Sequence, residues 1–312
     1  MSRNADPNWA NPCSINSKTA IQLHRLHKIA TWTSNHSAGT IDPMFGLKQR
    51  PVKRLDFIVP GAQKSGTTAL YYFLKQHPQI LLPDRQELHF FDDEQVFARP
   101  VDYQSLHQQF GKARRRPKVG EVTPNYLYWK PAIERIHAYN PRIKLIILLR
   151  NPVDRAFAHW NMQRFKNREP LDFLEAVKEE PRRTAQPLSI ESRRFAYIER
   201  GFYSAQLKRV FEFFPREQVE IIKFEDFRDR KQKTLDRIFD FLDVKRIRIP
   251  ADKDRNVVPY ERAMTLEERK YLLAVFATEI AELEQMLGWD LPDWRLGPLS
   301  ATGSRQIDVA AD

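Results

Sequence analysis

The chain has 312 residues, of which 42% are hydrophobic and 29% are charged, and its formal net charge is +11. This composition is typical of a globular enzyme with a full core and argues against an intrinsically disordered protein. The single cysteine, Cys13, excludes an intramolecular disulfide framework, and no apolar run approaches the roughly 20 residues of a membrane span. Because no basic-then-apolar signal sequence follows Met1, we expect a cytoplasmic protein without a transmembrane segment.

Residues 1–54 are rich in Asn, Ser, Thr and Pro, and they carry more than half of the net positive charge. Eight Lys or Arg residues stand against two Asp residues there, a net charge of +6. We predict a basic, polar N-terminal tail or arm that is either simply solvated or attracts a polyanionic partner. The run Arg114–Arg116 leaves the same two alternatives open. No recognised nucleic-acid-binding motif accompanies the charge, so we do not expect nucleic acid as a partner.

From Leu55 onward the pattern alternates between strands and helices. Short apolar segments indicate strands at residues 55–60, 118–122, 144–149 and 219–223. Helical patterns occupy residues 67–76, 204–214, 235–242 and 266–287, and further helices begin near Pro131 and Pro152. The alternation predicts an α/β domain over residues 55–295 with a P-loop-type three-layer fold, in which helices flank a central parallel sheet. We expect residues 296–312 to form a C-terminal tail.

A glycine-bounded loop, Gly61–Gly66, follows the first predicted strand and opens the first helix. Backbone N–H groups and the helix dipole favour an anion at such a position, Lys64 adds a positive charge, and Thr67 and Thr68 add hydroxyl donors. The loop of nucleoside-triphosphate enzymes places its lysine directly after the last glycine, whereas Lys64 precedes Gly66 by two positions. We therefore predict a phosphate-binding loop without a metal; the alternative is a glycine turn without a ligand.

The segment PGAQKSGTTALYYFLKQHPQI resembles the 5′-phosphosulfate loop of sulfotransferases that use 3′-phosphoadenosine 5′-phosphosulfate (PAPS). It is most similar to the heparan sulfate N- and 3-O-sulfotransferase branch and its bacterial relatives, and the resemblance extends roughly from Leu55 to Trp294. It implies that PAPS is the co-substrate, that 3′,5′-adenosine diphosphate is the product, and that no metal takes part. The residues that it assigns to the 5′ end of the donor are Lys64, Ser65, Gly66, Thr67 and Thr68.

A second motif, LRNPVDRAFAH, resembles the 3′-phosphate motif of the same family and begins at the end of strand 144–149. Arg150 lies where ligands bind in open α/β sheets, and its planar fork matches a phosphate. Arg155 either assists it or pairs with Asp154 or another nearby carboxylate. The family places a serine eight residues after the arginine, and here that residue is Ala158, so one hydrogen bond to the phosphate is in doubt.

Three later residues complete the predicted nucleotide site. Gly201-Phe202-Tyr203 is similar to a family motif at the start of a helix near the nucleotide, although Tyr203 could equally belong to the core. The family also closes over the nucleotide with a basic Lys-Gly-Arg loop. Lys253 and Arg255 are the candidates here, but the motif itself is not reproduced.

The segment Arg85–Asp92 supplies a carboxylate and an imidazole two residues apart, a spacing that places both on one face of an extended chain. It resembles the Glu-x-His-Phe-Phe motif of the heparan branch. By that resemblance Glu87 is the general base, His89 orients it or the acceptor, and Lys64 stabilises the bridging oxygen during in-line displacement. The alternatives are an ion pair of Glu87 with Arg85, and His89 as a structural residue or as the base.

The stretch from Gly120 to Tyr126 resembles the family segment that borders the acceptor. Val122 stands where heparan enzymes place a lysine, which argues against heparan sulfate itself as substrate. We expect a sulfotransferase that acts on a hydroxyl or amine of a carbohydrate or small metabolite. Two other functions remain open, an ATP-dependent P-loop kinase and a non-catalytic polyanion-binding module. His77 and His159 are predicted to be structural.

Overall fold

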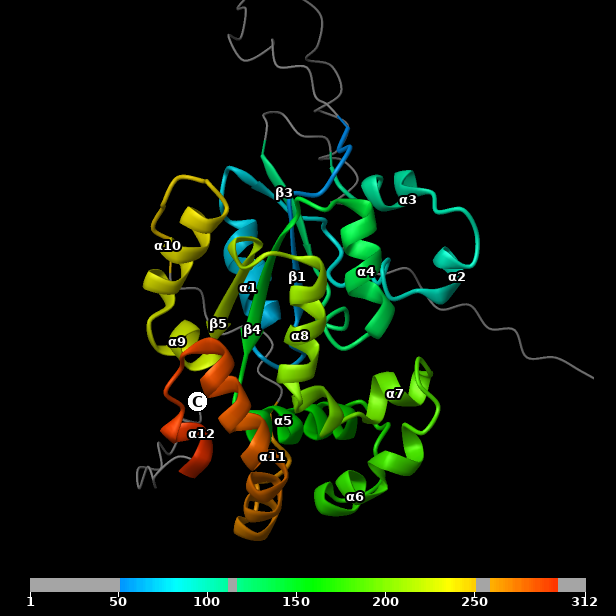
Figure 1. The fold of residues 1–312 in the computed structure, drawn as a ribbon, viewed down its shortest axis with the longest axis vertical. Coiled ribbons are helices and arrows are strands. Elements are labelled where there is room, and N and C mark those ends of the chain that lie inside the picture. The colour runs from blue at the N-terminus through cyan, green and yellow to red at the C-terminus, as the bar shows by residue number, and fades with distance from the viewer. Residues whose placement is uncertain (1–50, 112–116, 251–258, 297–312) are drawn as a thin grey trace, which may run out of the picture. The chain divides into compact units, whose positions relative to one another are not determined.

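The computed structural model describes residues 51–111, 117–250 and 259–296. In these residues five strands form one sheet in the order β2-β3-β1-β4-β5, and every neighbouring pair is parallel (Figure 1). Their bounds are β1 Phe57–Gly61, β2 Ile80–Leu81, β3 Lys118–Val122, β4 Lys144–Leu149 and β5 Val219–Lys223. Because the strands are parallel, their carboxyl ends meet at one edge of the sheet.

Helices connect and cover the strands. Those in the first half of the chain are α1 Thr67–Lys75, α2 Glu94–Phe97, α3 Tyr103–His107, α4 Lys130–Tyr139 and α5 Pro152–Phe165. The middle of the chain contributes α6 Phe173–Arg183, α7 Ile190–Phe195, the 3₁₀ turn η1 Glu199–Gly201, α8 Tyr203–Phe213 and the 3₁₀ turn η2 Arg216–Gln218. The last are α9 Phe224–Asp229, α10 Lys231–Phe241, α11 Leu266–Leu287 and α12 Pro292–Leu296.

Strand β4 shows how the sheet separates two hydrophobic cores. Its side chains alternate, so that Leu145, Ile147 and Leu149 pack into one core with residues of α4, α5, α8 and α11. Ile146 and Leu148 enter the other core with residues of α1 and α10. Helices therefore cover both faces of a parallel sheet, and the predicted three-layer α/β fold is confirmed (Figure 1).

The predicted elements agree well with the structure where the apolar pattern is long. Strands β3, β4 and β5 and helix α11 have the predicted bounds, while β1 begins two residues later than expected. Strand β2 and helices α2, α3, α6, α7, α9 and α12 were not predicted. Residues 1–50 and 297–312, and with them most of both predicted tails, lie outside the described residues. In the described part of the chain, no helix is both long and apolar enough to span a membrane.

Candidate active site

The loop between β1 and α1 ends in an open helix N-terminus. Gly66 precedes α1 with φ +86°, in the left-handed region, and no side chain caps the helix. A Cβ atom at Gly66 would lie 2.9 Å from the Phe224 ring, so the position requires glycine. The first turn of α1 contains no acidic residue. The unsatisfied N–H groups and the helix dipole are thus available to an anion.

The structure brings two of the predicted anion-binding residues together at this edge of the sheet. Arg150 directly follows β4, and its Nη1 donates a hydrogen bond of 3.2 Å to the backbone carbonyl of Lys64. The Arg150 guanidinium also lies 5.1 Å from the centre of the Phe224 ring. Burial, reinforced by the positive charge of Arg150, lowers the pKa of Lys64 to about 8. Two cationic side chains this close together suit a multiply charged anion.

Arg155 lies in the interior beside this cluster, and it forms no ion pair with any residue that the structure describes. Its side chain is fully buried, and Nη2 donates to the backbone carbonyl of Tyr197. Its Nε and Nη1 have no partner within the described residues. Asp154 pairs instead with Arg269 at 2.9 Å, so the predicted alternative of an Arg155–Asp154 pair is wrong. Burial lowers the pKa of Arg155, and the opposing effect of the Glu180 carboxyl offsets this only in part.

The Tyr203 side chain contacts the residue that directly follows β4. Its hydroxyl donates a hydrogen bond of 3.0 Å to the backbone carbonyl of Arg150, and the ring is fully buried. Burial raises the pKa of Tyr203 to about 12, so the phenol stays protonated at neutral pH. Ser65 in the loop and Thr67 at the start of α1 are buried, and Thr68 is half-buried. Lys253 and Arg255 lie outside the described residues.

The side chains of Glu87 and His89 lie close together, but the backbone between them is not extended as their spacing predicted. Both residues are left-handed, with φ 53° and 55°, which corrects the predicted extended segment. His89 Nε2 lies 3.4 Å from Glu87 Oε2, and about two fifths of each side chain is exposed, 38% and 41%. The Glu87 N–H donates a hydrogen bond of 3.2 Å to the carbonyl of Val122 at the end of β3, which anchors the segment. Among the described residues Glu87 forms no ion pair with Arg85.

His89 is held on its other side by a buried carboxylate that the sequence analysis did not assign to the site. His89 Nδ1 lies 2.9 Å from Asp92 Oδ2, and the Asp92 side chain is fully buried. Burial opposes the charged imidazole, but the hydrogen bonds to Asp92 and Glu87 outweigh it and raise the pKa of His89 to about 9. The ring therefore bridges two carboxylates and carries a positive charge at neutral pH.

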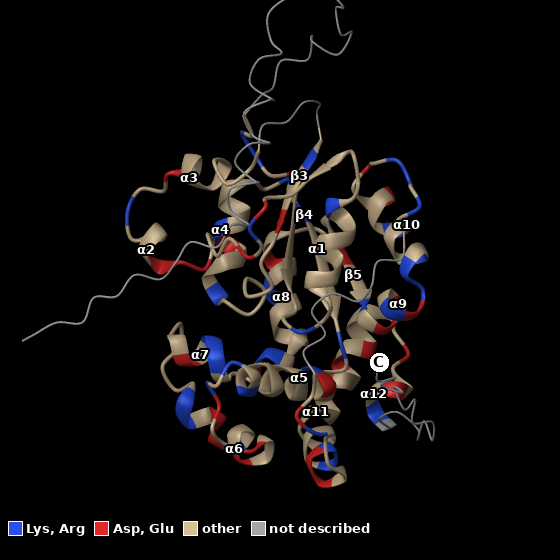
Figure 2. Cartoon of the chain, turned by 180° about the vertical axis from the view of Figure 1, so that it is seen from behind, with Lys and Arg blue, Asp and Glu red and all other residues tan. Residues whose placement is uncertain are grey.

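Asp92 is in turn held by residues from distant parts of the chain. Asn125 donates to Asp92 Oδ2 through Nδ2, and Arg193 Nη1 donates to the same oxygen at 3.0 Å. Arg193 lies on α7, one of several segments with Lys and Arg residues in Figure 2. The only sequence signal for Asp92 was its position three residues after His89. No pattern marked Asn125 or Arg193.

The stretch that was expected to border the acceptor lies behind this segment, with its side chains buried. The Tyr126 hydroxyl accepts hydrogen bonds from the backbone N–H groups of Phe90, at 2.9 Å, and Phe91, at 3.4 Å. Glu121 accepts a hydrogen bond of 2.9 Å from the Thr123 hydroxyl. Burial raises the pKa of Glu121 to about 7. The buried Tyr126 hydroxyl therefore supports the Glu87–Asp92 segment from the protein interior.

The two remaining histidines of the prediction have structural surroundings. His77 Nε2 lies 2.8 Å from the Lys245 carbonyl, and its Nδ1 accepts a hydrogen bond from the Gln79 N–H. His159 is fully buried in α5, and burial lowers its pKa well below the usual value, so its ring is neutral. Neither histidine reaches the Glu87 segment. In the described ranges, no cluster of three or more His, Cys, Asp or Glu side chains could hold a metal ion.

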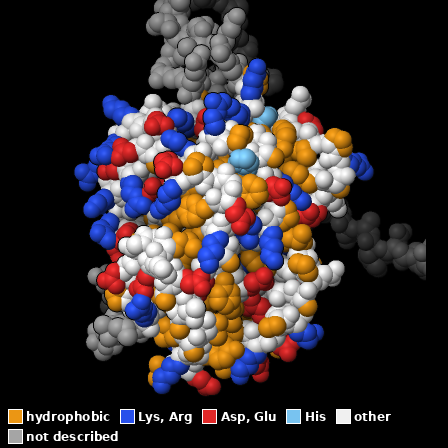
Figure 3. Space-filling model, in the orientation of Figure 1, with side chains coloured by type: hydrophobic (Ala, Val, Ile, Leu, Met, Phe, Trp, Pro, Cys, Tyr) orange, Lys and Arg blue, Asp and Glu red, His pale blue; other side chains and the backbone are white. Residues whose placement is uncertain are grey.

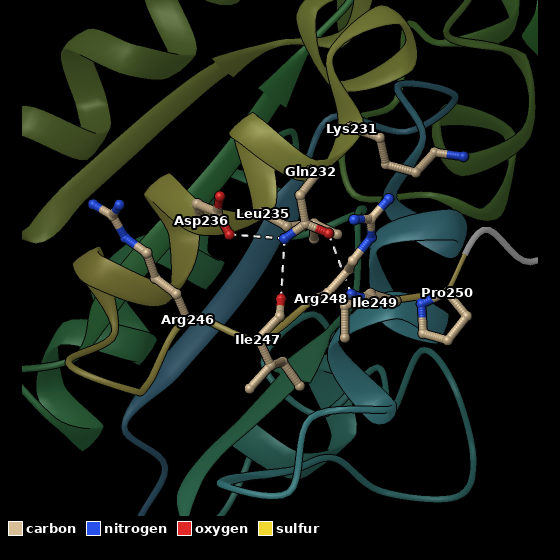
Figure 4. Close-up of a pocket in the computed structure, with 9 residues that line it drawn as sticks. All are labelled: Lys231, Gln232, Leu235, Asp236, Arg246, Ile247, Arg248, Ile249 and Pro250. Carbon is tan, nitrogen blue, oxygen red and sulfur yellow. Dashed lines mark hydrogen bonds between the residues drawn. The ribbon is translucent and has the colours of Figure 1, made fainter.

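A pocket of about 500 Å³ lies elsewhere, between α10 and the segment that follows it (Figure 4). Gln232 fixes this segment by donating to the Ile247 carbonyl and accepting from the Ile249 N–H. None of the predicted site residues that the structure describes lines this pocket. It is therefore separate from the cluster around Lys64 and Glu87.

Comparisons with known proteins agree on one family. A family model described as the sulfotransferase domain matches residues 54–255. A solved sulfotransferase structure from Alicyclobacillus acidocaldarius is 32% identical, with a TM-score of 0.66, and the match covers 78% of this chain and all of that one.

Curated relatives match with lower identity. The membrane-associated sulfotransferase kil1 of Dictyostelium discoideum is 25% identical over 75% of this chain and 65% of its own length. The human bifunctional heparan sulfate N-deacetylase/N-sulfotransferase 3 is 27% identical over 77% of this chain and 25% of its own length. The mouse heparan sulfate glucosamine 3-O-sulfotransferase 5 is 28% identical over 53% and 46%, respectively. The chain thus spans less than two thirds of the length of each of these relatives.

Proposed function

Because the chain belongs to the sulfotransferase domain family, we propose that it transfers a sulfuryl group from PAPS to a hydroxyl or amine of an acceptor. The observation that carries this proposal is the cluster formed by the open N-terminus of α1, Lys64 and Arg150 at the carboxyl edge of the sheet. Arg155 supports it, since two of its buried nitrogens have no partner in the described part of the chain. Such a set of donors fits a nucleotide with phosphates at both ends.

In the proposed reaction, Glu87 accepts the proton of the acceptor hydroxyl as that oxygen attacks sulfur. The new oxygen–sulfur bond forms while the bond from sulfur to the phosphate oxygen breaks, and 3′,5′-adenosine diphosphate leaves. Lys64 offsets the negative charge that develops on the departing oxygen. Glu87 is well placed for this role because its side chain is 41% exposed and thus accessible to an acceptor.

The protonation of His89 favours Glu87 over His89 as the base. With a pKa of about 9, His89 already holds a proton at neutral pH and cannot accept another. A charged imidazole 3.4 Å from Glu87 can instead orient the carboxylate. We therefore assign base catalysis to Glu87 and orientation to His89.

For the acceptor we propose a carbohydrate, on the strength of the names of the heparan sulfate relatives. Heparan sulfate itself is not proposed, because Val122 replaces the family's lysine and its side chain is buried, with 4% exposure. A small metabolite is the second acceptor class to screen. The cytoplasmic location stays a prediction.

Two observations bear on the alternative functions. Arg150 occupies the end of β4, where a metal-dependent kinase could place an acidic metal ligand. Acidic and basic side chains are mixed on the face shown in Figure 3, whereas a polyanion-binding module favours a continuous basic surface. Both observations favour the sulfotransferase proposal.

Thermal stabilisation by nucleotides tests the proposed donor. A ligand that binds only the folded protein adds about 2.7 kcal/mol of stability at a hundred times its Kd. We expect 3′,5′-adenosine diphosphate to raise Tm far more than 5′-AMP or ATP, with no requirement for magnesium. A magnesium-dependent shift with ATP alone would support the kinase, and no shift with any nucleotide would support the binding module.

Arg150→Ala separates the two ends of the nucleotide. If Arg150 binds the 3′-phosphate, the substitution weakens 3′,5′-adenosine diphosphate at least tenfold more than 5′-AMP, as measured by calorimetry. Because Arg150 also contacts the Lys64 carbonyl, some loss of both ligands is expected. Arg182→Ala, at an exposed arginine on α6, is the matched control. Equal weakening of both nucleotides would mean that Arg150 acts only on the loop.

A further inference from the structure

Both terminal nitrogens of the Arg193 guanidinium donate hydrogen bonds to Asp92. Nη1 donates to the Asp92 carboxylate at 3.0 Å, and Nη2 donates to the backbone carbonyl of the same residue. The guanidinium lies 4.1 Å from the centre of the Trp129 ring, and this indole is buried. A planar fork that binds the side chain and the backbone of one residue fixes both the position of that residue and its rotamer.

The contacts of Arg193 close a ring of four residues. The Arg193 carbonyl accepts a hydrogen bond of 3.2 Å from Arg200, and Arg200 donates to Asn125 Oδ1 at 2.6 Å. Asn125 completes the ring through its hydrogen bond to Asp92. The four residues come from the segment after β2, the segment after β3, η1 and α7. Asp92 is therefore held by parts of the chain about 30 to 100 residues away.

We propose that Arg193 is a positioning residue for sulfuryl transfer, which fixes the Asp92 carboxylate and through it holds the His89 ring against Glu87. The inference rests on the proposed role of Glu87 as the base. His89 needs such support because its left-handed backbone does not by itself determine where the ring lies, and Asp92 Oδ2 lies only 2.9 Å from its Nδ1. Removing Arg193 leaves Asp92 with one side-chain donor fewer and with a free backbone carbonyl.

Several charged groups surround the His89–Asp92 pair, and they determine how the loss of Arg193 affects it. Glu87 lies on the same segment, Glu121 approaches from β3, and Arg193 and Arg200 approach from α7 and η1. Among the described residues, the cations within hydrogen-bonding distance of the Asp92 carboxylate are His89 and Arg193. The loss of Arg193 therefore changes the contacts of Asp92 directly, and it affects Lys64 and Arg150 only indirectly.

The test compares Arg193→Met with the wild type in the full chain. Methionine keeps an aliphatic side chain over Trp129 but removes the fork. We expect kcat to fall tenfold or more, while KM for PAPS and the Kd of 3′,5′-adenosine diphosphate change less than twofold. Proton NMR of protein with ¹⁵N-labelled histidine supplies a second measurement, because a fixed His89 Nδ1–H gives a downfield, slowly exchanging signal. We expect Arg193→Met to lose this signal.

Arg182→Met is the matched control, since Arg182 also forms an ion pair but is exposed on α6. It should keep kcat and the His89 signal, which is assigned by its absence in His89→Gln. Wild-type kcat together with an intact His89 signal in Arg193→Met would overturn the proposal. A loss of Tm and of nucleotide affinity in proportion to kcat would overturn it too, because Arg193 would then be merely structural.

If Arg193→Met does not fold, Arg193→Lys carries the test, since lysine keeps the charge but not the fork. A lower kcat with unchanged KM for PAPS supports the proposal, and wild-type kcat contradicts it. The His89 signal needs no substrate, so it tests Arg193 even if no sulfuryl transfer is found. Failure of the proposed function would appear separately, as a wild-type protein that 3′,5′-adenosine diphosphate does not stabilise.

Discussion

At the residue scale, backbone conformation marks the candidate active site. Six non-glycine residues have a positive φ among those described, and three of them are Lys64, Glu87 and His89. A left-handed backbone costs a non-glycine residue about 1 kcal/mol or more, so the surrounding contacts must hold it. The residues given catalytic roles are thus placed by their surroundings at a cost in local conformational energy.

Glu87→Gln tests the base directly. The amide keeps the size of the side chain but cannot accept the acceptor proton, so we expect kcat to fall at least a hundredfold with nucleotide affinity unchanged. Steady-state kinetics and calorimetry with 3′,5′-adenosine diphosphate measure the two effects. Glu267→Gln, at an exposed position of α11, should leave both unchanged. Normal turnover in Glu87→Gln would remove Glu87 as the base.

The pH dependence of donor capture tests Lys64. Its pKa is lowered to about 8, so the free protein loses this positive charge as the pH rises through 8. We expect kcat/KM for PAPS to fall up to tenfold per pH unit above 8. In Lys64→Arg, whose guanidinium stays charged, this decline should disappear even if the rate is lower. Lys75→Arg serves as the control; the same pH profile in Lys64→Arg as in the wild type would exclude Lys64 as its cause.

Single residues of the site were predictable only where they stood in a local motif. Glu87 and His89 were predicted from their spacing and from a family resemblance, and the structure brings them together, although both have a left-handed and not an extended backbone. Arg193 could not be found, because its partner Asp92 lies 101 residues away and no local pattern encodes that contact. The burial of Arg155 was equally invisible, since it depends on how α5 packs.

At the element scale, the start of α1 decides whether the loop can bind an anion. The left-handed Gly66 turns the chain so that the helix begins without a cap, and Phe224 at the start of α9 packs against it. Helices shorter than α1 depend more on tertiary contacts than on their own sequence. That is why α2, α3, α7 and α9, with four to six residues each, were not predicted, whereas the 22 residues of α11 were.

Gly66→Ala should damage both the helix start and the binding site. A Cβ would lie 2.9 Å from Phe224 and would strain the left-handed backbone, so we expect the free energy of unfolding to fall by about 1–3 kcal/mol. Affinity for 3′,5′-adenosine diphosphate should fall as well. Gly111→Ala is the control because no atom lies within 4 Å of its added Cβ. Urea unfolding and calorimetry decide; equal values for both variants would contradict the role of Gly66.

At the scale of the whole molecule, two carboxyl groups, Glu121 and Glu180, are buried and form no ion pair within the part of the chain that the structure describes. Burial raises the pKa of Glu121 and of Glu180 to about 7. Glu180 accepts hydrogen bonds from the backbone N–H groups of Ile198 and Glu199, and Glu121 accepts one from the Thr123 hydroxyl. The free energy of unfolding therefore depends on pH through the protonation of these two carboxyl groups.

The sign of this effect is fixed by the direction of the shifts. The folded protein binds these protons more tightly than the unfolded chain, whose glutamates titrate near 4.5, so stability from both groups is lost as the pH rises from about 4.5 to 7. Each group contributes on the order of 3 kcal/mol over this range. Glu121→Gln with Glu180→Gln should flatten the pH dependence of urea unfolding, and Glu267→Gln should not. An unchanged slope in the double variant would disprove the raised pKa values.

The architecture was predictable because alternating strands and helices impose a parallel sheet covered on both faces. The position of the predicted phosphate-binding loop after the first strand followed from the same pattern. The order β2-β3-β1-β4-β5 could not be predicted, since no local sequence pattern states which strands are neighbours. The contact of α7 with the Glu87–Asp92 segment, through Arg193, was also beyond local patterns.

The ring formed by Asp92, Asn125, Arg200 and Arg193 limits how this protein can be redesigned. A graft that replaces the stretch from α6 through α7, in order to accommodate a different acceptor, would also remove one member of that ring. Chimeras with related domains should therefore keep an arginine at position 193 or replace its hydrogen bonds to Asp92 with others. None of the four residues of the ring lies on α1, so substitutions within that helix do not remove a member of the ring.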